Sequence, residues 1–304
     1  MTDGTWRRVT AGAVAGAAAT TAWATVVERN WFALRHVTVP ALRDAARAPL
    51  RVLHVSDLHL LPGQERKRAF VRGCARLAPD LVVATGDFLG RADAVEPAVE
   101  TMAALGADRP AVAVLGSNDR FQPRLRNPLG YFRGPNPRVD GPRMDTRRLT
   151  EGLTATGWRL VDNRRGLVDT AAGALDVAGL GDPHIGLDDP RRVDWAQPDT
   201  EVALRLGVVH APYLRALDVF DRHGYDLVLS GHTHGGQVRV PGVGALVANC
   251  DLPLSQARGL SRHGADLWLH VSAGLGTSPY APVRLACRPE ATLVDIVPGA
   301  PASR

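Results

Sequence analysis

Leu229-Ser230-Gly231-His232-Thr233-His234-Gly235-Gly236-Gln237 closes an apolar run of strand length at 225–229 and carries two histidines among glycines. Imidazole nitrogens bind transition metals. Glycines let the chain turn sharply and keep side chains away from whatever binds there. The stretch therefore predicts two metal ligands at the C-terminal end of a strand. The alternative is a polar turn that contains histidine by chance, and the rest of the chain decides between the two.

Polar turns also follow the other apolar runs of the chain. Runs at 50–55, 81–84 and 111–115 read as strands, and helical segments at 66–77 and 94–105 follow the first two. Repeated strand–turn–helix units predict an α/β layered fold. Continuous apolar runs fit strands that are covered on both faces. The turns after these strands, and the one after a later strand at 202–209, are Ser56-Asp57-Leu58-His59, Thr85-Gly86-Asp87, Gly116-Ser117-Asn118-Asp119 and His210.

The second half of the chain holds shorter strands separated by turns. Strands at 158–161, 167–170 and 175–180 predict antiparallel hairpins in a second sheet. A helix at 214–223 precedes the opening stretch. Strands at 267–272 and 291–297 close the fold.

Side chains of metal-ligand type end every central strand in this prediction. Ligands of open α/β sheets bind at the carboxyl ends of strands, so these side chains should converge. One Asp after a strand is commonly a turn or a helix cap, but chance explains the whole set poorly. We expect the metal ligands to be Asp57, His59, Asp87, Asn118 or one of its neighbours, His210, His232 and His234.

This donor set predicts two metal ions. Four histidines with carboxylates suit Mn, Fe or Zn, and seven donors exceed what one tetrahedral zinc uses. Two metals that share a carboxylate would use them all. Two-metal sites clamp an in-line displacement at phosphorus, and a bridging hydroxide, formed near neutral pH, is the nucleophile. Such a site needs no Ser or Cys nucleophile.

The order of these five motifs resembles the calcineurin-like metallophosphoesterase superfamily over residues 50–297. The forms at 56–60 and 230–237 are most similar to its YkuE/YaeI-type branch, whose members are often attached to membranes or exported. The resemblance implies a four-layer αββα sandwich of two mixed β-sheets flanked by helices. It also implies that Asp57, His59, Asp87 and His234 hold one metal, and that Asp87, Asn118, His210 and His232 hold the other. Asp87 would bridge the two, and Asp87, Asn118 and His232 are the expected catalytic residues.

The third motif departs from the family pattern. The family has Gly-Asn-His followed by Asp or Glu, in which the Asn ligates metal and the His acts on the transition state or the leaving group. This chain reads Gly116-Ser117-Asn118-Asp119. Aligned without a gap, Ser117 replaces the ligand. Shifted by one residue, Asn118 supplies it, which we prefer because an amide oxygen binds metal better than a neutral hydroxyl. In both alignments the histidine is missing, and general acid catalysis is typically worth ~10²–10⁴-fold.

The N-terminal segment and one internal loop stand apart from the motifs. Residues 9–27 are uncharged and long enough to cross a bilayer. We expect residues 1–48 to be a membrane anchor or export signal plus a linker, with 32–42 as an extended link, and 49–304 to be the catalytic domain. Arg7 and Arg8 favour an extracytoplasmic catalytic domain at the cell membrane, although arginines after the segment weaken this. An exported form is the alternative. The Pro- and Arg-rich stretch 120–148 predicts a basic loop.

Composition limits the function only broadly. The net charge of +5 fits anionic substrates, membrane headgroups or nucleic acid, but it is also common in Arg-rich proteins. No nucleic-acid or protein partner is predicted. The three cysteines form no Cys-x-x-Cys pair, which excludes a zinc ribbon. We expect His54 to support the site from the core. His184 and Arg284 are candidates for substrate contact, although an ordinary surface position is the simpler reading of Arg284.

These observations predict a dimetal phosphoesterase. Phosphodiester or pyrophosphate bonds, in a lipid or another cell-envelope molecule, are the preferred substrates. A phosphomonoesterase, including a protein phosphatase, is one alternative. A metal-binding scaffold protein with little catalysis is another, because the third motif lacks its histidine.

Overall fold

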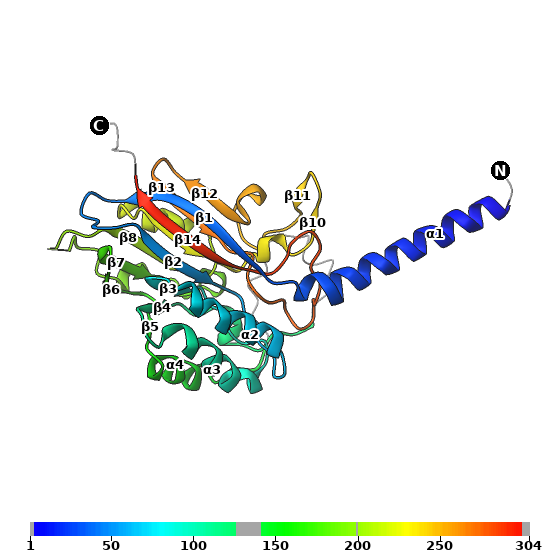
Figure 1. The fold of residues 1–304 in the computed structure, drawn as a ribbon, viewed down its shortest axis with the longest axis horizontal. Helices are drawn as coiled ribbons and strands as arrows, with labels where there is room; N and C mark the ends of the chain where they lie inside the picture. Colours follow the sequence, from blue (N-terminus) through cyan, green and yellow to red (C-terminus); the bar gives the residue numbers. More distant parts are fainter. Residues whose placement is uncertain (1–2, 126–140, 199, 300–304) are drawn as a thin grey trace.

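Two six-stranded mixed sheets form the framework of the protein in the computed structural model, which describes residues 3–125, 141–198 and 200–299 (Figure 1). The first sheet has the order β1-β14-β2-β3-β4-β5, in which β2 to β5 are parallel to one another and β14 is antiparallel to β2. Its strands are β1 (Ala33–Leu42), β14 (Glu290–Pro298), β2 (Leu50–Val55), β3 (Leu81–Ala84), β4 (Ala111–Ala113) and β5 (Trp158–Leu160).

The second sheet has the order β12-β13-β9-β8-β7-β6. Its four central strands are parallel, and both edge strands run antiparallel to their neighbours. Its strands are β12 (Gly259–His263), β13 (Leu267–Val271), β9 (Leu227–Ser230), β8 (Leu204–Val209), β7 (Gly173–Gly179) and β6 (Arg164–Thr170).

Three apolar clusters fix the layers. The middle cluster combines side chains of both sheets, such as Val52 and Val83 with Leu206 and Leu229, so the sheets pack face to face. The outer face of the first sheet packs against α2 (Glu65–Gly73), α3 (Val95–Gly106) and α4 (Thr146–Ala155). The outer face of the second packs against α5 (Leu214–Arg222). The predicted four-layer αββα sandwich of mixed sheets is confirmed.

Two strand predictions were wrong. Residues 33–42 do not form a free link, because they form β1 and pair in parallel with β14 at the edge of the first sheet. Pro40 lies within this strand, which an edge position tolerates because one side of an edge strand needs no backbone donor. The strand near Trp158 belongs to the first sheet, parallel to β4, and not to a hairpin of the second. The helix α4 supplies the crossover that this parallel pairing needs.

The N-terminal helix α1 (Asp3–Ala22) projects away from the two sheets (Figure 1). With the turns that follow, it forms a 25-residue helical segment, Trp6–Asn30, of mean hydropathy 1.2, whose most apolar window is only 6% buried. By length and composition this helix is able to cross a membrane. The predicted basic loop lies largely outside the described residues, which resume at 141 after a gap from 126.

Candidate metal centre

The predicted ligands lie on tight turns directly after strands β2, β3, β4, β8 and β9. Five of them have a positive φ, which is uncommon for residues other than glycine: Asp57, His59, Asp87, His232 and His234. Strained backbone of this kind concentrates at functional sites, where the surrounding structure enforces it. Gly231 is required by close packing, because a Cβ there would overlap Ser56 and the Asp57 carboxylate.

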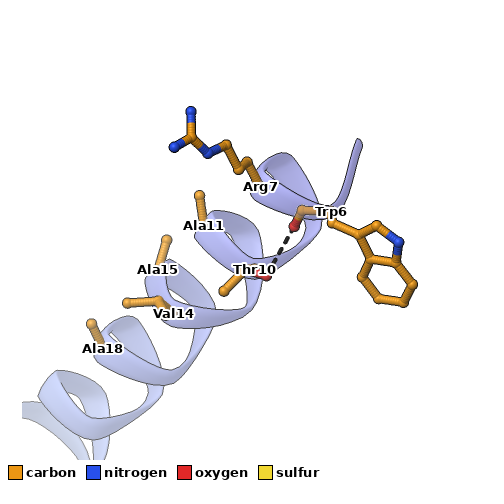
Figure 2. Close-up of a pocket in the computed structure, with 7 residues that line it drawn as sticks. All are labelled: Trp6, Arg7, Thr10, Ala11, Val14, Ala15 and Ala18. Carbon is orange, nitrogen blue, oxygen red and sulfur yellow. Dashed lines mark hydrogen bonds between the residues drawn. The ribbon is translucent and has the colours of Figure 1, made fainter. Parts of the chain in front are cut away.

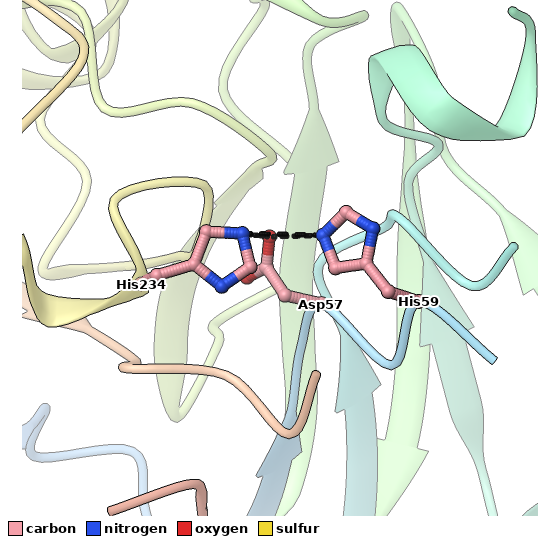
Figure 3. A group of neighbouring side chains, drawn as sticks. All are labelled: Asp57, His59 and His234. Carbon is pink, nitrogen blue, oxygen red and sulfur yellow. Dashed lines mark hydrogen bonds and ion pairs between the residues drawn. The ribbon is translucent and has the colours of Figure 1, made fainter. Parts of the chain in front are cut away.

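The first group of donors comprises Asp57, His59 and His234 (Figure 3). All three side chains are buried and come from two different sheets. The Nε2 atoms of His59 and His234 face each other at 3.1 Å. Asp57 Oδ1 lies 3.9 Å from His59 Nε2 and 3.7 Å from His234 Nε2. One cation between these atoms would have a carboxylate and two imidazoles as ligands.

The second group shares Asp57 and adds Asp87 and His210. Asp87 Oδ2 lies 3.5 Å from His210 Nε2 and 3.4 Å from His59 Nε2, so this carboxylate faces a histidine of each group. His210 Nδ1 pairs with the carbonyl oxygen of Thr85 at 2.6 Å. That contact directs Nε2 into the site, as partners of metal-binding histidines usually do.

The third motif is held against Asp87. The backbone N–H of Asn118 donates to Asp87 Oδ1 at 2.8 Å, and its side-chain amide lies 2.5 Å from Asp87 Oδ2. Asn118 thus lies where the shifted alignment needs a ligand, although its role as a ligand stays a prediction. Asp119 is fully buried and accepts N–H bonds from Asp87, Leu89 and Gly116, which ties the second and third turns together.

His232 lies beside the two groups and belongs to neither. Its ring lies 5.2 Å from that of His210 and 4.4 Å from that of His184, and its Nε2 is 3.2 Å from the carbonyl oxygen of Asn249. His184, a candidate for substrate contact, is buried beside His232 and pairs with the Tyr213 hydroxyl. Both imidazoles therefore border the second group, and their functions stay proposals.

Burial and mutual charge control the protonation of the cluster. Burial lowers the pKa of His232 and His234 well below the usual value and that of His59 to about 4, so these imidazoles are neutral. Burial raises the pKa of Asp57 to about 6. Burial alone would lower the pKa of His210, but the carboxylates of Asp87, Asp182 and Asp57 raise it to about 10. The neighbouring carboxylates therefore favour the protonated form of His210.

The residues present fit divalent cations. The Nε2 atom of His210 is buried and has no hydrogen-bond partner among the described residues, although it faces a carboxylate. Neutral imidazoles and ionised carboxylates are the protonation states that bind metal. A cation would replace the proton of His210 and compensate carboxylates that burial otherwise destabilises. The donor chemistry suits Mn, Fe or Zn.

The groups that lie behind His234 carry no signal in the sequence. Arg284 is fully buried, so its predicted surface position was wrong. Its Nη2 atom donates to the carbonyl oxygens of Ala273 and Gly276 and lies 3.3 Å from His234 Nδ1. These bonds show that Arg284 supports the backbone behind His234, and its contact with a substrate stays a prediction. No spacing in the sequence marks this role.

The base of the N-terminal helix contacts the segment that lies behind His234. Glu28 is 5% exposed, and its Oε1 accepts the N–H of Cys287 at 2.6 Å. The thiol of Cys287 contacts the carbonyl oxygen of His234 at 3.3 Å, and Arg284 N donates to the carbonyl oxygen of Ala24. The helix base is therefore joined through one segment, 284–287, to a candidate metal ligand.

A buried chain of polar side chains supports Asp57 from the core. His54 pairs with His270 through its Nδ1 and with the Thr85 hydroxyl through its Nε2, each at 3.0 Å. Thr85 donates to Ser56, and Ser56 donates to Asp57 Oδ2 at 2.5 Å. His54 therefore acts on the site through other groups, as the sequence predicted.

An open hollow on helix α1 is distant from this chemistry. Its lining includes Trp6, Ala11, Val14, Ala15 and Ala18. Figure 2 shows the last four side chains on one side of the helix and Trp6 on the other. An isolated helix with small side chains presents such a surface, and nothing in its lining beyond Arg7 carries charge. We assign it no ligand.

Comparison with known proteins agrees with the geometry. The family model of the calcineurin-like phosphoesterases matches residues 50–236, which contain all seven predicted ligands. The chain belongs to the calcineurin-like phosphoesterase family. It is therefore a metallophosphoesterase-type hydrolase, from a family that typically binds divalent metals.

Individual relatives place this calcineurin-like phosphoesterase more closely. It is 27% identical to Phosphodiesterase YaeI of Escherichia coli strain K12, over 89% of this chain and 90% of that protein, which confirms the predicted branch. It is 25% identical to UDP-2,3-diacylglucosamine pyrophosphatase LpxG of Chlamydia trachomatis, over 63% of this chain and 65% of that protein. It is 28% identical to a transmembrane protein with metallophosphoesterase domain of Bos taurus, over 86% of this chain and 56% of that longer protein.

We expect Glu28→Ala to weaken metal binding by the full-length protein, because the Cys287 N–H and the wall behind His234 lose their buried partner. Supporting partners of metal ligands are typically worth 10–100-fold in metal affinity, and about tenfold is expected at this greater distance from the ions. Titration with Co²⁺, followed by its visible absorption in detergent, measures the change. Glu28→Gln keeps an acceptor oxygen and should recover most of the affinity. Equal affinity in wild type and Glu28→Ala would contradict the role of Glu28.

Proposed function

We propose that the protein is a dimetal phosphodiesterase or pyrophosphatase, attached to the cell membrane, that acts on a lipid or another cell-envelope phosphate ester. The observation that carries the chemistry is Asp87, whose buried carboxylate faces His59 on one side and His210 on the other. One metal would be held by Asp57, His59, Asp87 and His234, and the other by Asp87, Asn118, His210 and His232. When bound, the ions supply Lewis acidity at phosphorus and lower the pKa of water.

The chain's own side chains position the reaction. Asp119 holds the second and third turns together, and Thr85 directs the imidazole of His210. No imidazole occupies the third motif, so we expect esters with good leaving groups to react fastest. His184 lies beside the proposed ligand His232 and is a candidate for proton transfer to a poorer leaving group.

Membrane attachment is supported by the helical segment Trp6–Asn30 and by the transmembrane relative. Arg7 and Arg8 precede the apolar stretch, which favours an extracytoplasmic position for the catalytic domain. We also propose that the catalytic domain begins at β1, near residue 32, and not at 49, because β1 is part of the first sheet.

Hydrolysis of bis-p-nitrophenyl phosphate and p-nitrophenyl phosphate by the full-length protein in detergent, with Mn²⁺, tests this function. We expect the diester to react faster and chelation of the metal to abolish both activities. Preference for the monoester would overturn the diesterase assignment in favour of a phosphomonoesterase. Hydrolysis of neither ester by protein with bound metal would overturn the enzymatic proposal. A protein truncated to 50–304 would lose β1 and is unsuitable for the assay.

A further inference from the structure

The short hairpin of β10 (Arg239–Val240) and β11 (Gly244–Ala245) exposes apolar side chains. Val243 at its tip is 73% exposed, and Val240 and Leu246 are 40% and 41% exposed. A Cβ at Gly242 would meet no atom within 4 Å, so the tip projects freely. Large apolar side chains grouped on one projecting tip indicate a contact surface for an apolar partner.

Backbone contacts attach this hairpin to the base of the N-terminal helix. Arg239 N donates to the carbonyl oxygen of Leu285 at 2.9 Å, and Arg284 N donates to the carbonyl oxygen of Ala24 at 3.0 Å. Tyr280, in the same segment, is 46% exposed. The hairpin, this segment and the helix base lie side by side at the end of the molecule from which α1 projects (Figure 1).

The helix base has the composition of a membrane–water boundary. Trp23 and Trp31 are 44% and 46% exposed and meet edge to face at 6.0 Å, while Val26 between them is 65% exposed. Tryptophan is enriched at this boundary. Trp6, at the other end of the helix, lies about 26 Å from Trp23 at 1.5 Å per residue, close to the ~30 Å core of a bilayer.

Charge favours a lipid surface as the occupant. Residues 238–249, which contain the hairpin, include Arg239 and no acidic residue. Residues 273–287 include no acidic residue either, and their single charged residue, Arg284, is buried inside the protein. Arg288 lies over the ring of Trp31 at 3.9 Å. Apolar side chains with neighbouring arginines match the acyl region and anionic headgroups of a membrane.

We propose that the hairpin 239–246 inserts into the bilayer surface beside the helix and holds the candidate metal centre against the membrane. The hairpin begins five residues after the predicted ligand His234, and Arg239 Nη1 donates to the carbonyl oxygen of Gly235 at 2.8 Å, so the docked surface and the site are rigidly joined. This arrangement suits a phosphate ester carried by a membrane amphiphile. The inference rests on the membrane attachment proposed above and sharpens the substrate class.

Fluorescent labelling of the full chain in vesicles of neutral and anionic phospholipid tests the docking without any need for activity. The three native cysteines are buried, so introduced cysteines react selectively with an environment-sensitive dye. The sites are Val243→Cys at the hairpin tip, Val14→Cys in the helix, and Leu167→Cys, which is exposed on the distant strand β6. We expect spin-labelled lipid to quench the labels at positions 14 and 243. Aqueous iodide should quench the label at 167 several-fold more strongly than the labels at 14 and 243.

The docking would be overturned if the label at 14 is shielded from iodide while the label at 243 is as accessible to iodide as the label at 167. Accessible labels at both 14 and 243 would overturn membrane attachment as well. Hydrolysis of bis-p-nitrophenyl phosphate by the same samples reports on the proposed chemistry separately.

Activity on a lipid ester provides a second test. Val243→Asp should lower the hydrolysis of phosphatidyl-p-nitrophenol in vesicles several-fold and leave hydrolysis of soluble bis-p-nitrophenyl phosphate unchanged. Leu167→Asp is the matched control and should change neither rate. An equal loss on both substrates, or no loss on the lipid ester, would contradict the proposal.

Discussion

Replacement of Asp87 by alanine is expected to lower kcat on bis-p-nitrophenyl phosphate by at least about 10³-fold. The carboxylate faces a histidine of each donor group, so its loss removes a group placed between the two proposed ions and leaves Asp57 as the one carboxylate that both groups share. Metal-assisted stabilisation of the transition state is worth several kcal/mol, and each 1.36 kcal/mol is tenfold in rate. Metal analysis of the purified variant should show fewer than two ions per chain.

Ser117→Ala is the matched control for this prediction. Ser117 neighbours the proposed ligand Asn118, and the structure places the side chain of Asn118 against Asp87. Activity close to wild type in Ser117→Ala would support Asn118 as the ligand. Activity as low as that of Asp87→Ala would show that the alignment without a gap is correct. Full activity in Asp87→Ala itself would contradict the bridging role.

Asp119→Ala should be the variant with the largest combined loss of stability and metal affinity. The Asp119 carboxylate accepts three buried N–H bonds, and each unsatisfied buried donor costs about 1–3 kcal/mol. Burial and the charge of Asp87 raise the pKa of Asp119 to about 8, while the N–H bonds oppose this rise. The free energy of unfolding, measured by urea denaturation, should fall by several kcal/mol, and metal affinity by about 10–100-fold.

Asp119→Asn separates the two effects. It keeps one acceptor oxygen and should recover part of the stability and of the metal affinity. Asp93→Ala removes an exposed carboxylate that pairs with Arg91 and should change neither quantity. A stable Asp119→Ala variant that binds metal with wild-type affinity would contradict the role assigned to Asp119.

The sequence predicted that ligand-type side chains meet at the strand ends because the signals there are local. Each apolar run has strand length, each turn carries its ligand, and parallel strands bring those turns to one edge. The convergence of Asp57, Asp87 and His210 therefore followed from the pattern. The two wrong predictions concerned segments whose local signals pointed elsewhere. Proline disfavours a strand, but β1 tolerates Pro40 at the sheet edge, and Trp158 stands close in sequence to a hairpin but pairs with β4.

The amino-acid sequence by itself determined the layered fold and the family of this protein, and the ligand set that it predicts stays a prediction. Only the tertiary structure decided that Arg284 is buried behind His234, that Asp119 clamps two turns, and that Glu28 joins the helix base to the site. The contacts of Glu28 and Arg284 cross large separations in sequence, and Asp119 acts through backbone N–H groups. Arg and Glu usually lie on the surface, and the sequence does not reveal when one of them is buried as a hydrogen-bond partner of the backbone. Such burial depends on which backbone groups the fold leaves unpaired beside the side chain.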